Sequence, residues 1–149
     1  MNYQSGSHAA DFELNQRLQS DTFFLGSFDL SMLLLMNDER VPWFILVPKI
    51  SGTTDLFQLS EVEANMLAQE VRLVSAFLKT ILNVDKVNIA AIGNIVEQLH
   101  IHIVGRYKND PLWPGVVWGQ GEARLYSSQR QRDLQSQFNE FLEMELANP

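Results

Sequence analysis

The 149-residue sequence contains no cysteine, no long apolar run and few basic residues. Without cysteine the chain forms no disulfide and offers no thiolate as nucleophile or metal ligand. The richest apolar stretch, residues 31–36, is far shorter than the ~20 residues that cross a bilayer. Residues 1–10 lack the basic start and apolar core of a secretion signal, so we expect a flexible leader there. Together these absences favour a cytoplasmic protein without a membrane partner.

The charge balance is acidic, with 18 Asp and Glu against 11 Lys and Arg and a formal net charge of −7. Proteins that bind DNA or RNA usually present a basic face that displaces counterions from many phosphates. Because the basic residues here are few and scattered, we expect no nucleic-acid polymer as partner. A small anionic ligand is compatible with this balance, since a few backbone N–H groups hold one phosphate locally.

Hydropathy patterns predict a single domain over residues 1–149, because no repeat, low-complexity tract or linker divides the chain. A weak apolar stripe predicts a short helix over residues 11–18. From residue 22 the pattern is that of strands, and residues 27–47 are interpreted as a two-stranded hairpin.

The clearest helix signal is a capping box over Ser60–Glu63, followed by apolar residues at steps of three and four. Asn83 provides the stop signal. Strands are predicted over residues 87–92 and 98–105, and a C-terminal helix over residues 128–146. Strands joined by hairpins, with one long helix between them, indicate an α+β fold with an antiparallel sheet of about five strands.

Within the predicted strand over residues 98–105, Gln98, His100 and His102 occupy alternate positions. Side chains two apart on a strand share a face, so these three should line up while the residues between them enter the core. A neutral imidazole can attack phosphorus near pH 7, because its ordinary pKa of ~6.5 leaves much of it unprotonated. The attacking nitrogen must carry the lone pair. We therefore expect the other ring nitrogen to donate a hydrogen bond, for example to a backbone carbonyl.

The same spacing has two other interpretations. A His-x-His pair on a strand is often polar surface, and it sometimes supplies two ligands to a metal ion. The interpretation as a metal site is the weaker one, because the nearby sequence offers only Glu97 as a third strong ligand. The side chain of Glu97 should face away from the two histidines. His8 lies far along the predicted leader. From spacing alone, surface, metal pair and nucleophile all stay open.

Taken together, these segments resemble the histidine triad (HIT) family, whose motif is His-φ-His-φ-His-φ-φ with φ apolar. Residues 98–104 have the sequence Gln-Leu-His-Ile-His-Ile-Val. Residues 93–97 are similar to the family's lead-in, and residues 43–49 to its His-Phe-Leu-Val-Ile-Pro-Lys strand. The resemblance covers residues 22–115 approximately and implies the HIT-like α+β fold.

The resemblance also implies a chemistry. Members of the family bind nucleotides and split or transfer nucleoside monophosphates through a covalent nucleotidyl-histidine. The motif places the nucleophile on His100 and a contact to phosphate and leaving group on His102, with Gln98 beside them in the catalytic group. Substrate-binding positions fall on three amides: phosphate-contacting Asn94, Asn37 near the ribose, and Asn88 at another polar position of the site.

From the resemblance we expect hydrolysis or transfer on a nucleoside phosphate, a phosphoramidate or a dinucleoside polyphosphate. It implies no organic cofactor and no metal held by the protein, although a divalent cation can accompany a polyphosphate substrate. It also implies a homodimer whose sheets join. Weaker candidates are Arg106, for a phosphate contact or as plain exposed surface, and Trp113, for base stacking, a dimer edge or packing.

Two positions depart from the family pattern. Gln98 replaces the first His of the motif, and Trp43 replaces an additional His in the family's other strand. Those two positions interact in the family, so the pair of changes has the pattern of a coupled replacement. Because Gln carries no proton between pH 5 and 8, the alternative function is a nucleotide-binding or sensing module with little or no catalysis.

Overall fold

The computed structural model describes residues 11–147, and its strands form one five-stranded sheet. The strands are β1 (Thr22–Ser27), β2 (Ser31–Met36), β3 (Trp43–Pro48), β4 (Lys86–Ala91) and β5 (Ile101–Arg106). They are ordered β1-β2-β3-β5-β4, and every neighbouring pair is antiparallel. The predicted α+β class with its antiparallel sheet is confirmed. The predicted leader over residues 1–10 lies outside the described residues.

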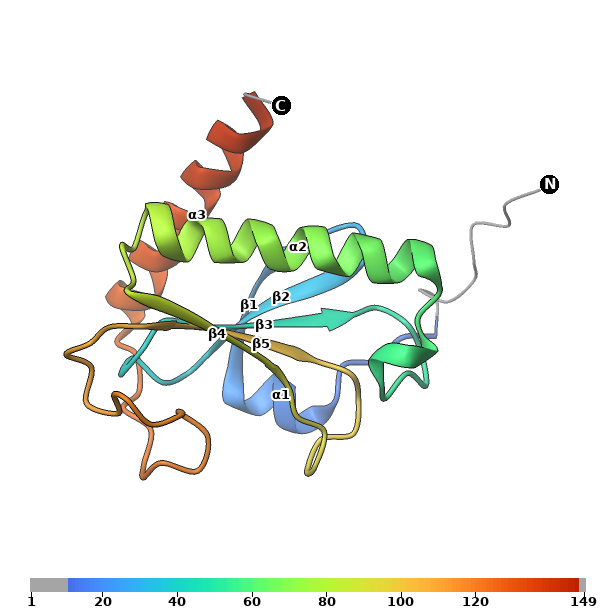
Figure 1. The fold of residues 1–149 in the computed structure, drawn as a ribbon, viewed down its shortest axis with the longest axis horizontal. Coiled ribbons are helices and arrows are strands. Elements are labelled where there is room, and N and C mark those ends of the chain that lie inside the picture. The colour runs from blue at the N-terminus through green and yellow to red at the C-terminus, as the bar shows by residue number, and fades with distance from the viewer. Residues whose placement is uncertain (1–10, 148–149) are drawn as a thin grey trace.

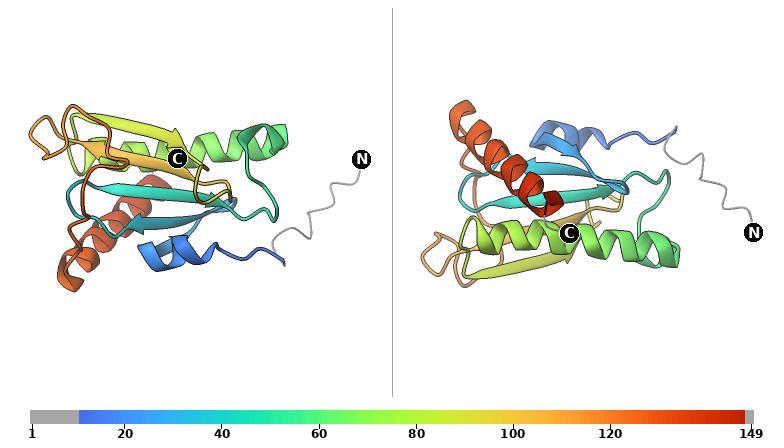
Figure 2. Two further views of the ribbon diagram at one scale, coloured as in Figure 1. Left: turned by 90° about the horizontal axis from the view of Figure 1, so that it is seen from below. Right: turned by 90° about the horizontal axis from the view of Figure 1, so that it is seen from above.

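Helices cover both faces of the sheet (Figure 1). The two long helices, α2 (Glu61–Thr80) and α3 (Ser128–Ala147), cross the same face, as the view from above shows (Figure 2). The short helix α1 (Gln16–Asp21) lies on the opposite face, and a 3-10 turn, η2 (Leu56–Gln58), precedes α2. None of the helices within residues 11–147 is long and apolar enough to cross a membrane.

Helix α2 forms where the local signals predicted it. The N–H of Glu63 donates to the hydroxyl of Ser60 at 3.3 Å, and the Glu63 carboxylate accepts the N–H of Ser60 at 2.8 Å. Its apolar face packs on the sheet and on α3 through Phe77, whose ring centre is 4.9 Å from that of Phe138. After the helix, Asn83 adopts a left-handed φ of 53°, which turns the chain towards β4. The capping box and the stop are therefore confirmed.

Two predicted boundaries at the N-terminal part of the chain are wrong. The short helix begins at Gln16 rather than residue 11, because the side chain of Asn15 accepts the N–H of Arg17 and caps the helix there. The hairpin predicted over residues 27–47 begins later, since β2 starts at Ser31 and pairs with both β1 and β3. The predicted hairpin is therefore present as β2 and β3, and β1 extends it to a three-stranded meander.

Towards the C-terminus the boundaries differ by one to three residues, and β4 spans Lys86–Ala91 rather than residues 87–92. Strand β5 begins at Ile101, three residues later than predicted, because the N–H of Leu99 donates to the carbonyl of Thr53 and the chain has not yet joined the ladder. Helix α3 ends at Ala147, one residue beyond the prediction.

The face of the sheet opposite α2 has its own apolar cluster. It is covered by α1 and by the segment of residues 107–127 between β5 and α3, which we call the β5–α3 connection (Figure 1). The cluster joins Leu18 of α1 and Val117 of the connection to Trp43 and Val104 of the sheet. Side chains alternate along β5, so Ile103 enters the core under α2, whereas His102 and Val104 lie on the face of this second cluster.

Candidate functional site

His100 lies just before β5, and its ring is held by the main chain two residues earlier. Its Nδ1 is 2.7 Å from the carbonyl oxygen of Gln98. A carbonyl oxygen only accepts, so Nδ1 carries the proton and donates it, and the lone pair of the neutral ring is on Nε2. This is the arrangement expected for a nucleophilic imidazole. Within residues 11–147, Nε2 of His100 has no hydrogen-bond partner.

A cleft of about 760 Å³ opens beside His100. Its walls are residues 54–57 before α2, residues 91–94 after β4, and residues 97–100. Of the predicted site residues, Asn94, Gln98 and His100 line this cleft. In the described part of the chain, no group of three or more His, Cys, Asp or Glu side chains is placed to hold a metal ion.

The side chain of Gln98 binds the main chain ahead of α1. Its Oε1 accepts the N–H of Asn15 at 2.9 Å, and its Nε2 donates to the carbonyl of Glu13 at 2.9 Å. The spacing had predicted that Gln98 lines up with the two histidines on one strand face. It does not, because its side chain binds the main chain ahead of α1. Its amide instead holds residues 13–15 next to Gln98 through these two hydrogen bonds.

His102 lies within β5, and its buried ring is oriented by Trp43 of β3. The indole Nε1–H of Trp43 donates to Nδ1 of His102 at 2.9 Å. Indole nitrogen only donates, so Nδ1 of His102 holds a lone pair and Nε2 carries the proton of the neutral ring. Burial, and to a smaller extent the neighbouring His100, lowers the pKa of His102 to about 3. At neutral pH this histidine is uncharged.

The expected direct coupling between positions 43 and 98 is absent from the described residues. Trp43 bonds to His102, whereas Gln98 bonds to the main chain of Glu13 and Asn15. Trp43 and Gln98 therefore make separate contacts in the structure.

Aromatic rings surround His102. The ring centres of His100, Trp118 and Trp43 are 4.8, 5.4 and 5.7 Å from its own. Trp118 comes from the β5–α3 connection and also meets Trp43 edge-on at 5.9 Å. Its Nε1 is buried and has no hydrogen-bond partner in the described part of the chain. Sequence reasoning missed Trp118, whose one signal is an aromatic residue in a segment rich in Gly and Pro.

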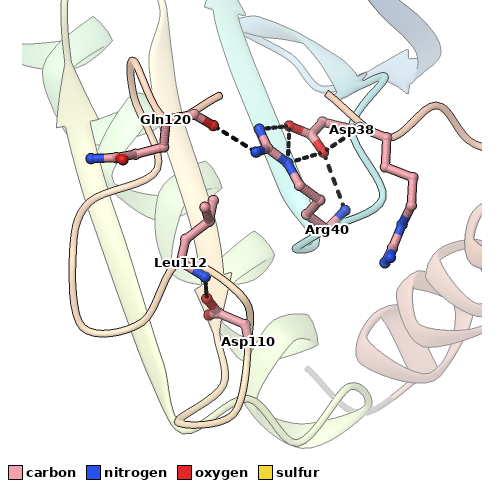
Figure 3. Close-up of polar contacts among 6 residues, drawn as sticks. Asp38, Arg40, Asp110, Leu112 and Gln120 are labelled. Atoms are coloured by element: carbon pink, nitrogen blue, oxygen red, sulfur yellow. Dashed lines mark hydrogen bonds and ion pairs between the residues drawn. The ribbon is translucent and has the colours of Figure 1, made fainter. Parts of the chain in front are cut away.

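The β5–α3 connection is fastened to the turn between β2 and β3 (Figure 3). Arg40 pairs with Asp38 and donates to the carbonyl of Gln120 at 2.6 Å. Asp38 also accepts the N–H of Arg124 at 3.3 Å. Burial raises the pKa of Asp38, but the hydrogen bonds from Arg40 and from the backbone outweigh it and hold the pKa below its usual range. This network anchors the connection that carries Trp118.

Two of the predicted amides serve the scaffold and do not line the cleft. Asn37 accepts the N–H of Tyr126 at 3.0 Å, which adds another link to the same connection. Asn88, on β4, accepts from the guanidinium of Arg106 at 3.2 Å. In this structure neither is placed beside His100 in the cleft.

Arg106 is neither a phosphate contact nor exposed surface. Its side chain is 1% exposed, pairs with Asp110 at 2.9 Å and donates to the carbonyl of Gly115 at 2.7 Å. Asp110 also accepts the N–H of Leu112 at 2.9 Å (Figure 3). The guanidinium carbon of Arg106 lies 5.6 Å from the ring centre of Trp113, so this tryptophan packs on the buried ion pair.

Comparison with known proteins places the chain in a family. The family model described as HIT domain matches residues 17–109. A crystal structure of a histidine triad (HIT) protein from Sinorhizobium meliloti is 40% identical with a TM-score of 0.86, and the match covers 89% of this chain and 98% of that one. A histidine triad protein from Marinobacter aquaeolei is 39% identical with a TM-score of 0.86, covering 89% and 97%. The chain belongs to the histidine triad family.

A more distant structure shares the fold. It is a hypothetical histidine triad nucleotide-binding protein from Sulfolobus tokodaii, 18% identical with a TM-score of 0.62, and the match covers 82% of this chain and 84% of that one. A search of functionally curated proteins gave no match.

Proposed function

We propose that this protein binds nucleotides and is a hydrolase or nucleotidyl transferase that works through a covalent nucleotidyl-His100 intermediate. The proposed substrate is a nucleoside phosphate, a phosphoramidate or a dinucleoside polyphosphate. One observation carries the proposal: the hydrogen bond from Nδ1 of His100 to a main-chain carbonyl leaves the lone pair on Nε2, beside an open cleft. Membership of the histidine triad family supports it, and the Sulfolobus protein is itself named for nucleotide binding.

The proposed reaction has two displacements at phosphorus. In the first, the lone pair on Nε2 of His100 forms a bond to phosphorus, and the leaving group departs with the electrons of the bond that breaks. In the second, water or another acceptor attacks phosphorus and releases its proton to solvent, and the electrons of the P–N bond return to Nε2. Throughout, Nδ1–H of His100 donates a hydrogen bond to the carbonyl of Gln98, which stabilises the positive charge that develops on the ring.

The other groups at the cleft have supporting roles in this proposal. Asn94 lines the cleft and contacts a phosphate oxygen of the substrate. Asp55 and Glu97 also line it, and their charges oppose the approach of a polyphosphate. A divalent cation bound to such a substrate offsets that repulsion, so assays of a dinucleoside polyphosphate require an arm with Mg²⁺ and an arm with a chelator.

The intermediate itself provides the test. The protein is mixed with a dinucleoside polyphosphate or a nucleoside phosphoramidate, quenched in alkaline denaturant that preserves the P–N bond, and weighed intact by mass spectrometry. We expect a mass increase of one nucleotidyl group (a nucleoside monophosphate less one water) in the unmodified protein and no increase in His100→Gln. An adduct of equal yield in His100→Gln, or product formation without any adduct at early times, would contradict the proposal.

The second candidate is a nucleotide-binding or sensing module with little catalysis. The observation that favours it is the neutral, buried His102, which does not supply a proton to a leaving group near pH 7. Under this alternative, calorimetry detects nucleotide binding that His100→Gln leaves unchanged, and no product accumulates.

Pairing of two copies into a homodimer is part of the proposal. Strand β4 is at the end of the sheet, and its Ile89 is 53% exposed. An uncovered edge strand with an exposed apolar side chain can pair with a second strand. Sedimentation velocity is expected to give twice the mass of the chain, and Ile89→Lys is expected to shift the protein towards the monomer. A monomer at all concentrations would refute this part.

A further inference from the structure

Trp43 gives His102 a hydrogen-bonding partner of a special kind. The indole N–H cannot accept a proton, cannot lose one near neutral pH, and is held on a buried strand. A histidine at position 43, the residue the family resemblance implies there, could instead donate, accept or become charged. Compared with a histidine, Trp43 can therefore neither accept a hydrogen bond nor become charged, and it can only donate to Nδ1 of His102.

We propose that Trp43 is a positioning residue that fixes His102 in the tautomer with its proton on Nε2, so that His102 meets the substrate as a neutral hydrogen-bond donor. The first half of this proposal concerns the free protein alone. The second half rests on the proposed function, because it needs a phosphate beside His100.

The strand partners and ring neighbours of His102 include one residue that can carry a charge. In the sheet its direct partners are Ile45 of β3 and Ala90 of β4. Its ring neighbours are Trp43, Trp118 and His100. Among these five residues only His100 has a side chain that can carry a charge, and a positive charge there disfavours a second one on His102.

Protonation of His102 would also break the hydrogen bond that orients it. A charged imidazole carries a proton on both nitrogens, so its Nδ1–H would oppose the Nε1–H of Trp43 at a distance of 2.9 Å. The buried ring would then have to rotate away from Trp43 and be charged without a carboxylate partner among the neighbours named above. These contacts favour the neutral form of His102 near neutral pH.

A neutral donor acts differently from a general acid. Nε2–H of His102 has no hydrogen-bond partner within residues 11–147. His102 is 5% exposed and does not itself line the cleft, but its ring centre lies 4.8 Å from that of His100, which does. Beside the nucleophile, it stabilises a phosphate oxygen that gains charge in the transition state but keeps its proton. The leaving group then takes any proton it needs from solvent.

Nitrogen NMR on the unmodified protein tests the tautomer without any substrate. In ¹⁵N-labelled protein, Nδ1 of His102 is expected to resonate as an unprotonated nitrogen and Nε2 as a protonated one, unchanged from pH 5 to 8. A scalar coupling across the hydrogen bond is expected between Nε1 of Trp43 and Nδ1 of His102. The chain has three histidines, and His100→Gln assigns the signals by elimination. A protonated Nδ1, titration within this range, or absence of the coupling overturns the proposal.

A matched pair of variants separates the hydrogen bond from aromatic packing. Trp43→Phe keeps an aromatic ring but removes the donor, so the signals of His102 are expected to become pH-dependent or to report a mixture of tautomers. Trp118→Phe removes an indole N–H that has no hydrogen-bond partner in the described residues, and the tautomer is expected to persist. Equal effects of the two substitutions overturn the proposal. If no nucleotidyl adduct forms while the tautomer is as expected, the proposed function fails and the role of Trp43 in the free protein stands.

Discussion

Replacing His100 with glycine is expected to lower turnover by at least about 10³-fold, and free imidazole is expected to restore part of it. The substitution removes the attacking nitrogen but leaves the carbonyl of Gln98 in place. The space left by the buried ring, which is 6% exposed, can admit an imidazole that donates to that carbonyl through one nitrogen and attacks phosphorus through the other. Steady-state rates against imidazole concentration measure the recovery.

A methylated analogue is the control for this experiment. 1-Methylimidazole has one nitrogen able to attack, but its other nitrogen carries a methyl group and cannot donate to the carbonyl of Gln98. Weaker rescue by 1-methylimidazole is therefore expected if that hydrogen bond orients the nucleophile. Turnover of His100→Gly near the level of the unmodified protein would exclude His100 as the nucleophile.

Replacing Asp110 with alanine is expected to lower the free energy of unfolding by about 3–5 kcal/mol. The side chains of Asp110 and Arg106 are 2% and 1% exposed, so the substitution leaves a buried guanidinium without its counter-charge. It also removes the acceptor of the N–H groups of Tyr107 and Leu112, which donate to the same carboxylate. Urea unfolding followed by circular dichroism measures the loss.

An exposed ion pair elsewhere in the chain provides the comparison. Arg17 and Asp21 are 3.5 Å apart with side chains 59% and 46% exposed, and Asp21→Ala is expected to cost less than about 1 kcal/mol. Burial raises the pKa of Asp110, but its hydrogen bonds, that from Arg106 first, outweigh this and lower it. The contribution of Asp110 is therefore present above the ordinary pKa of Asp and is lost as the pH falls below it. Similar losses for the two variants would show that burial of the Arg106 pair contributes nothing.

Prediction of the fold from the sequence succeeded where the signals were local. The capping box at Ser60 and the apolar period of α2 depend on residues within a few turns, so both appeared where expected. The start of β5 could not be placed in this way. It depends on a hydrogen bond between Leu99 and Thr53, which are distant in the sequence and adjacent only after folding.

The same distinction applies to the candidate site. The hydrogen bond of His100 was predictable because it joins residues two apart and follows from the chemistry of a nucleophilic imidazole. The bond between Trp43 and His102 joins residues 59 apart, and the Gln98 bonds reach across more than 80 residues. Trp118 belongs to no recognisable motif. Its contact with His102 depends on how Arg40 and Asp38 anchor the β5–α3 connection.

The two histidines differ in how easily mutation could disturb them. His100 is oriented by a carbonyl that every amino acid at position 98 would supply, so the side chain there is exchangeable without loss of the orienting bond. The side chain of Gln98 is therefore free to bind the main chain of Glu13 and Asn15. His102 is oriented by a side chain, and most single substitutions at Trp43 would remove that donor. The orientation of the proposed nucleophile therefore tolerates substitution of the residue that orients it, whereas the orientation of His102 depends on the side chain at position 43.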